Sequence, residues 1–330
     1  MPISRRKWDG QNAWHGSTRI VLILYGVTAT AWAWLNPVFE APDEPFHVAY
    51  VNLLVREHRW PSVADIRASA EYMKEHADPQ QDFRIFEAGQ SEIFLEWSQP
   101  PLYYLLQALP LALCYPRGFH GVLIPVRPDY RQHWERGYFQ HDPSEYRTWT
   151  RPLVAIRLMR MVSVALGVLT VWWTARLAHM VAPASRWLPM LTAALYAFIP
   201  QFTFMSAAVN NDVLGYLVNA VVMGVAIRVC RRTDPPLKTA LTFGCCLAIG
   251  LLVKSNTLFF GPLTMVLAML MYQRWRDRVV CIVGAIGIGA AIPWVTFFGE
   301  RIHPHLDLLG HALLGRPSTW FTFSTGFLGS

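Results

Sequence analysis

The chain has 330 residues, of which 53% are hydrophobic and 15% are charged, with a formal net charge of +7. A mean hydropathy of +0.24 and several long apolar runs exclude an ordinary soluble enzyme. The basic balance does not indicate a nucleic-acid-binding protein, because the basic residues form short clusters between the apolar runs instead of one stripe. The five cysteines lie in or beside apolar runs without metal-ligand spacing, so we interpret them as small hydrophobic residues.

Seven apolar runs are candidates for membrane spans, since roughly 20 helical residues cross the core of a bilayer. The runs are 20–35, 161–181, 188–206, 213–230, 239–253, 257–272 and 279–298. The first run follows a basic cluster, as in a signal peptide, but it continues through Trp34 and Leu35. We therefore interpret it as a span that is retained. The sequence predicts an all-α integral membrane protein with about seven transmembrane helices.

The stretch Pro100–Tyr115 decides the expected topology. As a helix it reaches only roughly 23 Å, against a bilayer core of about 30 Å, and Pro110 interrupts it. If the stretch does not cross, the arginine clusters share the side of the amino terminus, and the acidic segment 40–96 lies opposite. We expect a cytoplasmic amino terminus with the first helix (1–36), a large periplasmic or extracytoplasmic loop with juxtamembrane helices (37–152), six further transmembrane helices (153–298) and an outer segment (299–330).

The large loop opens with the sequence PDEPFH, in which Asp43, Glu44 and His47 lie within five positions. Asp43 has the position of an N-cap, and residues three or four apart on a helix lie on one face. The three side chains can therefore converge where the chain leaves the membrane. A capped helix with solvated acids is the alternative that this short motif leaves open. Farther along the loop, Ser62 and Asp65 resemble a capping box.

Other polar residues are expected at the same outer ends of the spans. They are Gln99 and Tyr103 in QPPLYY, Arg157 and Arg160 at the start of the second span, Asn210, Asn211 and Asp212 in NND, and Lys254. Helix capping or snorkelling to lipid headgroups would each explain part of this set. Together, carboxylates and cations beside the lipid surface favour an anionic, lipid-linked substrate whose reaction needs a base.

The order of these motifs resembles the GT-C superfamily of integral-membrane glycosyltransferases, which includes protein O-mannosyltransferases and the aminoarabinose transferases of lipid A. The resemblance rests on the acidic pair, the PPLYY helix, RMVSVALGVLTV (Arg160–Val171), IPQFTFMSAAVNNDVL (Ile199–Leu214) and GLLVKSNTLFFGP (Gly250–Pro262). It extends from Thr18 onward and is nearest to a bacterial branch with PDE..H and NND. Members of the superfamily usually have eleven or more spans, so the resemblance implies a chain truncated at its carboxyl end.

The resemblance implies an enzyme of the inner cell membrane that takes sugar from a polyprenyl-phosphate donor at the outer face. Asp43 or Glu44 would act at the acceptor, and Arg160 and Lys254 would match donor-phosphate positions. We further expect His47, Gln99 and Tyr103 to support the carboxylates.

Asn210, Asn211 and Asp212 are expected to contact the substrate. The other expected partners are membrane lipids and a glycan, lipid or protein acceptor, and no nucleic acid is expected. No cofactor is assigned, and a divalent cation at Asp43 and Glu44 is left open because no third ligand stands out. A flippase or transporter of lipid-linked sugars and an inactive truncated scaffold are the alternative functions.

Overall fold

The computed structural model describes residues 16–41, 43–62, 65, 96, 99–118, 141, 151–231 and 234–294. Within these residues the secondary structure is helical throughout, without strands, which confirms the predicted all-α class. The helices are α1 (Gly16–Leu35), α2 (Glu44–Glu57), α4 (Leu102–Cys114), α5 (Arg151–Val181), α6 (Leu188–Ala197), α7 (Pro200–Ser206), α8 (Asp212–Arg231), α9 (Pro236–Val253), the 3₁₀ helix η4 (Ser255–Phe259), α10 (Phe260–Met271) and α11 (Trp275–Pro293).

In the part of the chain that the structure describes, four helices are long and apolar enough to cross a membrane: α1, α5 from Leu153, α8 and α9. The bent pair α6 and α7, with 69° between its two parts, would be a fifth span. The break follows from Pro200, which cannot continue a helix from Phe198 and Ile199. Helices also form in the last two apolar runs, but α10 has only 12 residues, and the first turn of α11 carries the charged residues Arg276, Asp277 and Arg278. The count of seven spans therefore remains a prediction.

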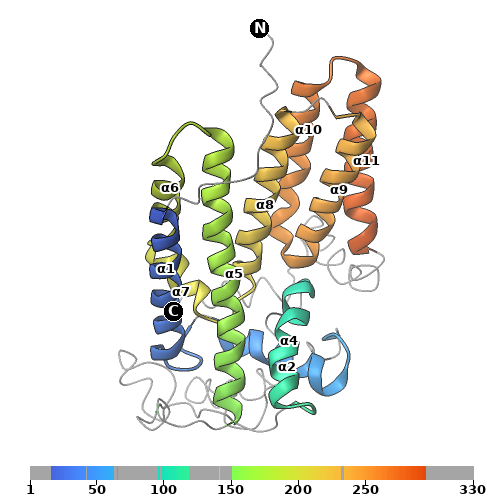
Figure 1. Cartoon of the computed structure of the whole chain (residues 1–330). Coiled ribbons are helices and arrows are strands. Elements are labelled where there is room, and N and C mark those ends of the chain that lie inside the picture. Colours follow the sequence, from blue (N-terminus) through green and yellow to red (C-terminus); the bar gives the residue numbers. More distant parts are fainter. Residues whose placement is uncertain are drawn as a thin grey trace, which may run out of the picture.

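Two shorter helices, α2 and α4, lie at the end of the molecule where α1 ends and α5 begins (Figure 1). Helix α4 contacts α2, α5 and α9. With 13 residues it is roughly 20 Å long, too short to cross a bilayer core of about 30 Å. One face of α4 is buried and carries Tyr103, Tyr104 and Gln107, whereas Leu109 and Leu113 on the other face are exposed.

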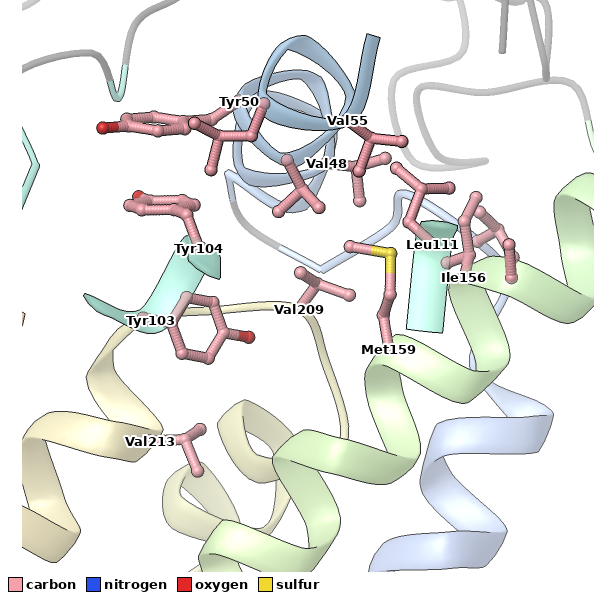
Figure 2. Packing of buried hydrophobic residues seen from close by; sticks show 14 of the residues in the cluster. Val48, Tyr50, Val55, Tyr103, Tyr104, Leu111, Ile156, Met159, Val209 and Val213 are labelled. Atoms are coloured by element: carbon pink, nitrogen blue, oxygen red, sulfur yellow. The ribbon is translucent and has the colours of Figure 1, made fainter. Parts of the chain in front are cut away.

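An apolar core fixes these two helices on α5 and on the turn before α8 (Figure 2). Its members include Val48, Tyr50, Tyr103, Tyr104, Ile156, Met159, Val209 and Val213. Each large side chain buried in such a core contributes about 1.5–3 kcal/mol relative to exposure. The spacing of Tyr50, Leu53 and Leu54 in the sequence predicts an apolar stripe that lies on the membrane, but in α2 these residues are buried against protein.

Candidate functional site at the α2 end

The site begins with an unusual backbone at Asp43. This residue is the N-cap of α2, but its φ of 60° and ψ of 0° lie in the left-handed region, and its side chain makes no capping hydrogen bond. Such a conformation is uncommon for a residue other than glycine and is tolerated best by Asn and Asp. Asp43 as a whole residue is exposed. The Asp43 carboxylate therefore does not hold the helix start by a hydrogen bond.

The adjacent Glu44 is fully buried and forms an ion pair with Arg160. Its Oε1 accepts hydrogen bonds from Arg160 Nε at 2.8 Å and from the Val209 backbone at 2.9 Å. Its Oε2 accepts from Arg160 Nη2 at 2.6 Å and from the Phe39 backbone at 2.9 Å. Four acceptor positions of one carboxylate are thus filled by protein donors.

Arg160 is also fully buried, and its five N–H groups all point at protein oxygens. Besides the two bonds to Glu44, its Nη1 donates to the carbonyls of Ala33 and Asn36, at 3.0 and 2.6 Å, and its Nη2 donates to that of Pro37 at 2.9 Å. This geometry differs from the sequence-based expectation of a donor-phosphate contact, because a guanidinium has only five donors and all are used. The neighbouring Arg157 lies over the ring of Trp34, 4.7 Å from its centroid.

The buried pair joins three parts of the chain that are far apart in sequence. Arg160 is on α5, Glu44 opens α2, and the Val209 amide lies in the turn that leads into α8. The carbonyls of Ala33 and Asn36 bring the end of α1 to the same guanidinium. One ion pair therefore fixes both Asp43, the residue before Glu44, and the turn that carries NND.

A second ion pair, between Lys254 and Asp212, lies at the same end. Asp212 is the first residue of α8, and its backbone N–H donates to Asn210 Oδ1 at 2.8 Å. Lys254 follows the last residue of α9 in an extended conformation, with φ of −159° and ψ of 138°. The side chain of Lys254 is 20% exposed and that of Asp212 is 30% exposed, so solvent reaches this pair, unlike the pair of Glu44 and Arg160.

The second asparagine of NND binds the loop before α4. Asn211 Nδ2 donates to Gln99 Oε1 at 3.0 Å, and the backbone carbonyl of Gln99 accepts from the Tyr50 hydroxyl at 3.4 Å. Asn210 and Asn211 are both buried, with 4% and 1% exposure. The structure thus brings the expected residues Gln99, Asn210 and Asn211 together, and their side chains hold loops around the two ion pairs.

His47 on α2 and Tyr103 on α4 are both buried. His47 Nδ1 and the Tyr104 hydroxyl are 2.9 Å apart, and burial together with the charge of Lys254 lowers the pKa of His47 to about 3. His47 is therefore neutral near pH 7. The Tyr103 hydroxyl lies 3.0 Å from Ser163 Oγ and accepts from Gln107 Nε2 at 2.8 Å, so this residue joins α4 to α5.

Sequence reasoning missed Glu96, which is partly buried at the same site. Burial raises its pKa, and the negative charges of Asp43 and Asp212 act in the same direction, whereas Gln99 and Lys254 lower it. Burial likewise raises the pKa of Asp43, which Lys254 lowers and Asp212 raises. Asp43, Glu96, Asp212 and Lys254 thus influence one another through their charges, and we call these four residues the electrostatic cluster. The sequence around Glu96 carries no motif that distinguishes it from the other acids of the loop.

Lys254 contacts Asp212, and its charge also acts on Asp43 and Glu96, so carboxylates in this neighbourhood can bind a cationic or hydroxyl-bearing ligand and accept a proton from it. Among the side chains that the structure describes, no three His, Cys, Asp or Glu residues are grouped as metal ligands. Glu44, expected as a possible cation ligand, directs both oxygens to Arg160 and to backbone amides.

The fold and the site define a multi-span helical membrane protein with a polar cluster at one end of its helices. The family model for dolichyl-phosphate-mannose-protein mannosyltransferases matches residues 130–309, which is more than half of the chain. The chain belongs to this family of GT-C glycosyltransferases, which confirms the resemblance seen in the sequence. Arg160, Asp212 and Lys254 lie in the matched region, and Asp43 precedes it. No curated protein and no solved structure matches the chain.

Proposed function

We propose that this glycosyltransferase moves a sugar from a polyprenyl-phosphate donor to an acceptor of the cell envelope, at the outer face of the inner membrane. The acceptor oxygen attacks the anomeric carbon of the sugar, with inversion. The bond from that carbon to the phosphate oxygen breaks, and the phosphate leaves with the electron pair. The acceptor proton passes to a carboxylate. A phosphate leaving group is a stable anion and needs no acid, but it benefits from a cation near its growing charge.

Asp43 is the proposed base, and its geometry is the observation that carries the proposal. Asp43 is an exposed, left-handed residue, and its carboxylate makes no capping hydrogen bond. Glu44, the other sequence candidate, has its four acceptor positions filled. Partial desolvation of its carboxyl group raises the pKa of Asp43, which makes the ionised form a better proton acceptor.

Lys254 is the proposed contact for the donor phosphate. It is partly exposed in the same electrostatic cluster as Asp43. Leu258 and Phe259, in the 3₁₀ helix that follows, are exposed apolar side chains suited to the neighbourhood of a lipid chain. Arg160 takes a positioning role in this proposal, because Glu44 and backbone carbonyls use its five donors.

The remaining site residues are proposed to hold the surrounding loops. Asn210 and Asn211 fix the start of α8 and the loop at Gln99. His47, neutral and bonded to Tyr104, keeps α2 against α4. Tyr103 keeps α4 against α5. Activity measured with and without a chelator tests for a divalent cation.

The test uses the natural protein in membrane vesicles and measures transfer of labelled sugar from a polyprenyl-phosphate donor to envelope acceptors. Asp43→Asn keeps the size of the side chain and tolerates the left-handed backbone, but it cannot accept the proton. We expect turnover to fall by roughly 10²-fold or more, with the apparent KM for the donor near that of the parent. An Asp43→Asn variant that works at the parent rate would remove Asp43 from catalysis.

Two further variants accompany Asp43→Asn: one tests the donor contact of Lys254, and the other is a control. Lys254→Met should raise the apparent KM for the donor, because an ammonium is lost from the phosphate position. Glu57→Gln, which changes an exposed acid at the other end of α2, is the matched control and should leave both constants unchanged. Parent protein that transfers no sugar from any polyprenyl-phosphate donor would contradict the proposed donor class.

A further inference from the structure

We propose that Asp212 competes with the donor for Lys254: its carboxylate holds the ammonium in the donor-free protein, and the donor phosphate must displace it. This inference rests on the proposed function and adds a residue that sets donor affinity. It changes the expected role of Asp212 from a substrate contact to a partner that gives way when the phosphate binds.

The backbones of both partners are fixed, so exchange is confined to the side chains. The Lys254 N–H donates to the Gly250 carbonyl at 2.9 Å, and the Lys254 carbonyl accepts from the N–H and hydroxyl of Thr257, at 3.1 and 2.7 Å. On the other side, the Asp212 N–H is bonded to Asn210. The lysine side chain, with four rotatable bonds, is the part that can turn from a carboxylate to a phosphate.

The two ion pairs at this end differ in how easily they can be replaced. Glu44 and Arg160 keep 0% and 1% of their side-chain exposure, and hydrogen bonds fix them from several sides. Lys254 and Asp212 keep 20% and 30%, which lets an incoming anion reach the ammonium. Partly exposed ion pairs contribute little to stability, because water competes for both charges. A phosphate with two acceptor oxygens can therefore replace the carboxylate.

Exchange at Lys254 also changes the surroundings of the proposed base. The ammonium now lowers the pKa of Asp43, and Asp212 raises it. When the phosphate takes the ammonium, the lowering effect is weakened and the released carboxylate still repels Asp43. The carboxylate of Asp43 then holds a proton more strongly. Donor binding is thus coupled to the strength of the base by charges that lie within one cluster.

The experiment measures equilibrium binding of labelled polyprenyl phosphate, without sugar, to the full chain in lipid nanodiscs. Asp212→Asn frees Lys254 and should tighten binding by about fivefold. Lys254→Met should weaken binding about tenfold or more. Adding Asp212→Asn to Lys254→Met should produce no further change, because no ammonium remains to be competed for. If Asp212→Asn does not fold, Asp212→Ser replaces it, and this variant should show the same tighter binding.

A matched control lies at the opposite end of α9, where Lys238 and Asp234 form an exposed ion pair at 3.1 Å. Asp234→Asn frees a lysine there and should leave binding unchanged. Unchanged or weaker binding in both Asp212 variants would overturn the competition. Tighter binding that persists in the Lys254→Met background would overturn it too, since simple removal of a negative charge would then suffice. If Lys254→Met binds as the parent does, the proposed donor contact itself fails.

Discussion

Residue 43 is an exposed aspartate with a backbone conformation that favours glycine. A left-handed residue with a Cβ costs about 1–2 kcal/mol, less for Asp, and such costs persist where a position has a use other than stability. The pattern PDE..H predicted the helix start and the polar residues there. It did not predict the left-handed backbone, since an ordinary N-cap lies in the extended region.

Replacing Asp43 with glycine separates the two properties. Asp43→Gly removes the steric cost of the left-handed backbone, so we expect the free energy of unfolding to stay equal or to rise by up to about 1 kcal/mol. Sugar transfer should be lost, because no carboxylate remains. Thermal unfolding in detergent and the transfer assay give the two readings. A loss of more than about 2 kcal/mol in stability would instead assign Asp43 a structural role.

His47 makes the stability of the protein depend on pH. Its pKa is about 3 in the folded protein and ordinarily 6.5, so the unfolded chain binds more protons between these values. Stability therefore rises with pH across this window and falls as the pH drops from about 6.5 toward 3. The slope from one such group is at most about 1.4 kcal/mol per pH unit.

The variant His47→Gln can still hydrogen-bond to Tyr104 but cannot take up a proton. We expect its unfolding temperature to fall less than that of the parent between pH 7 and pH 5. His58→Gln, which changes an exposed histidine at the end of the same helix, is the control and should retain the parent's slope. Equal slopes in the parent and in His47→Gln would place the acid-sensitive group elsewhere.

At the scale of helices, the position of α2 depends on the buried pair of Glu44 and Arg160. Breaking a buried pair by removing one charge leaves the other buried and unpaired, which costs about 3–5 kcal/mol. We expect this cost for Glu44→Gln and for Arg160→Met. The double variant should lose less than the sum of the two, because neither charge is then left alone.

Denaturant unfolding of the two single variants and the double variant measures this coupling. Glu57→Gln breaks an exposed pair with Arg56 on the same helix and should change stability by less than about 1 kcal/mol. Costs that simply add in the double variant would mean that the two side chains act independently. The sequence could not predict this ion pair, because Glu44 and Arg160 are 116 positions apart. Helix capping alone would explain an acid at the start of α2, and snorkelling alone would explain an arginine at the end of a span.

Local patterns did predict other parts of the helices. Ser62 and Asp65 form the expected capping box: the Ser62 N–H donates to Asp65 at 2.6 Å, and the Asp65 N–H donates to Ser62 Oγ at 3.3 Å. Most of the helix expected after it lies outside the described residues. Pro100–Tyr115 is expected to lie along the membrane, and α4 is as short as its apolar stretch indicates. Its contacts with α2 and α9 required the folded structure.

At the scale of the molecule, the charges divide between the two ends of the helices. The links from α5 to α6, from α8 to α9 and from α10 to α11 lie at the end opposite α2 and α4 (Figure 1). The basic residues Arg186, Arg231, Lys238, Arg274 and Arg276 lie in or beside these links. Cytoplasmic loops are enriched in Lys and Arg. The α2 end is therefore expected to face outward, as the sequence predicts.

Single cysteines in a background without the five native ones test this orientation with a membrane-impermeant thiol reagent. Asn210 is buried, so exposed positions serve better: Asp43 at the α2 end, and Arg231 and Arg276 at the other. We expect labelling of intact cells at position 43, and labelling at 231 and 276 only after the membrane is opened. Because α8 joins Asp212 to Arg231 in one apolar helix of 20 residues, the two ends must lie on opposite sides if α8 spans. Labelling of intact cells at position 231 but not at 43 would invert the molecule and move the proposed transfer to the cytoplasmic face.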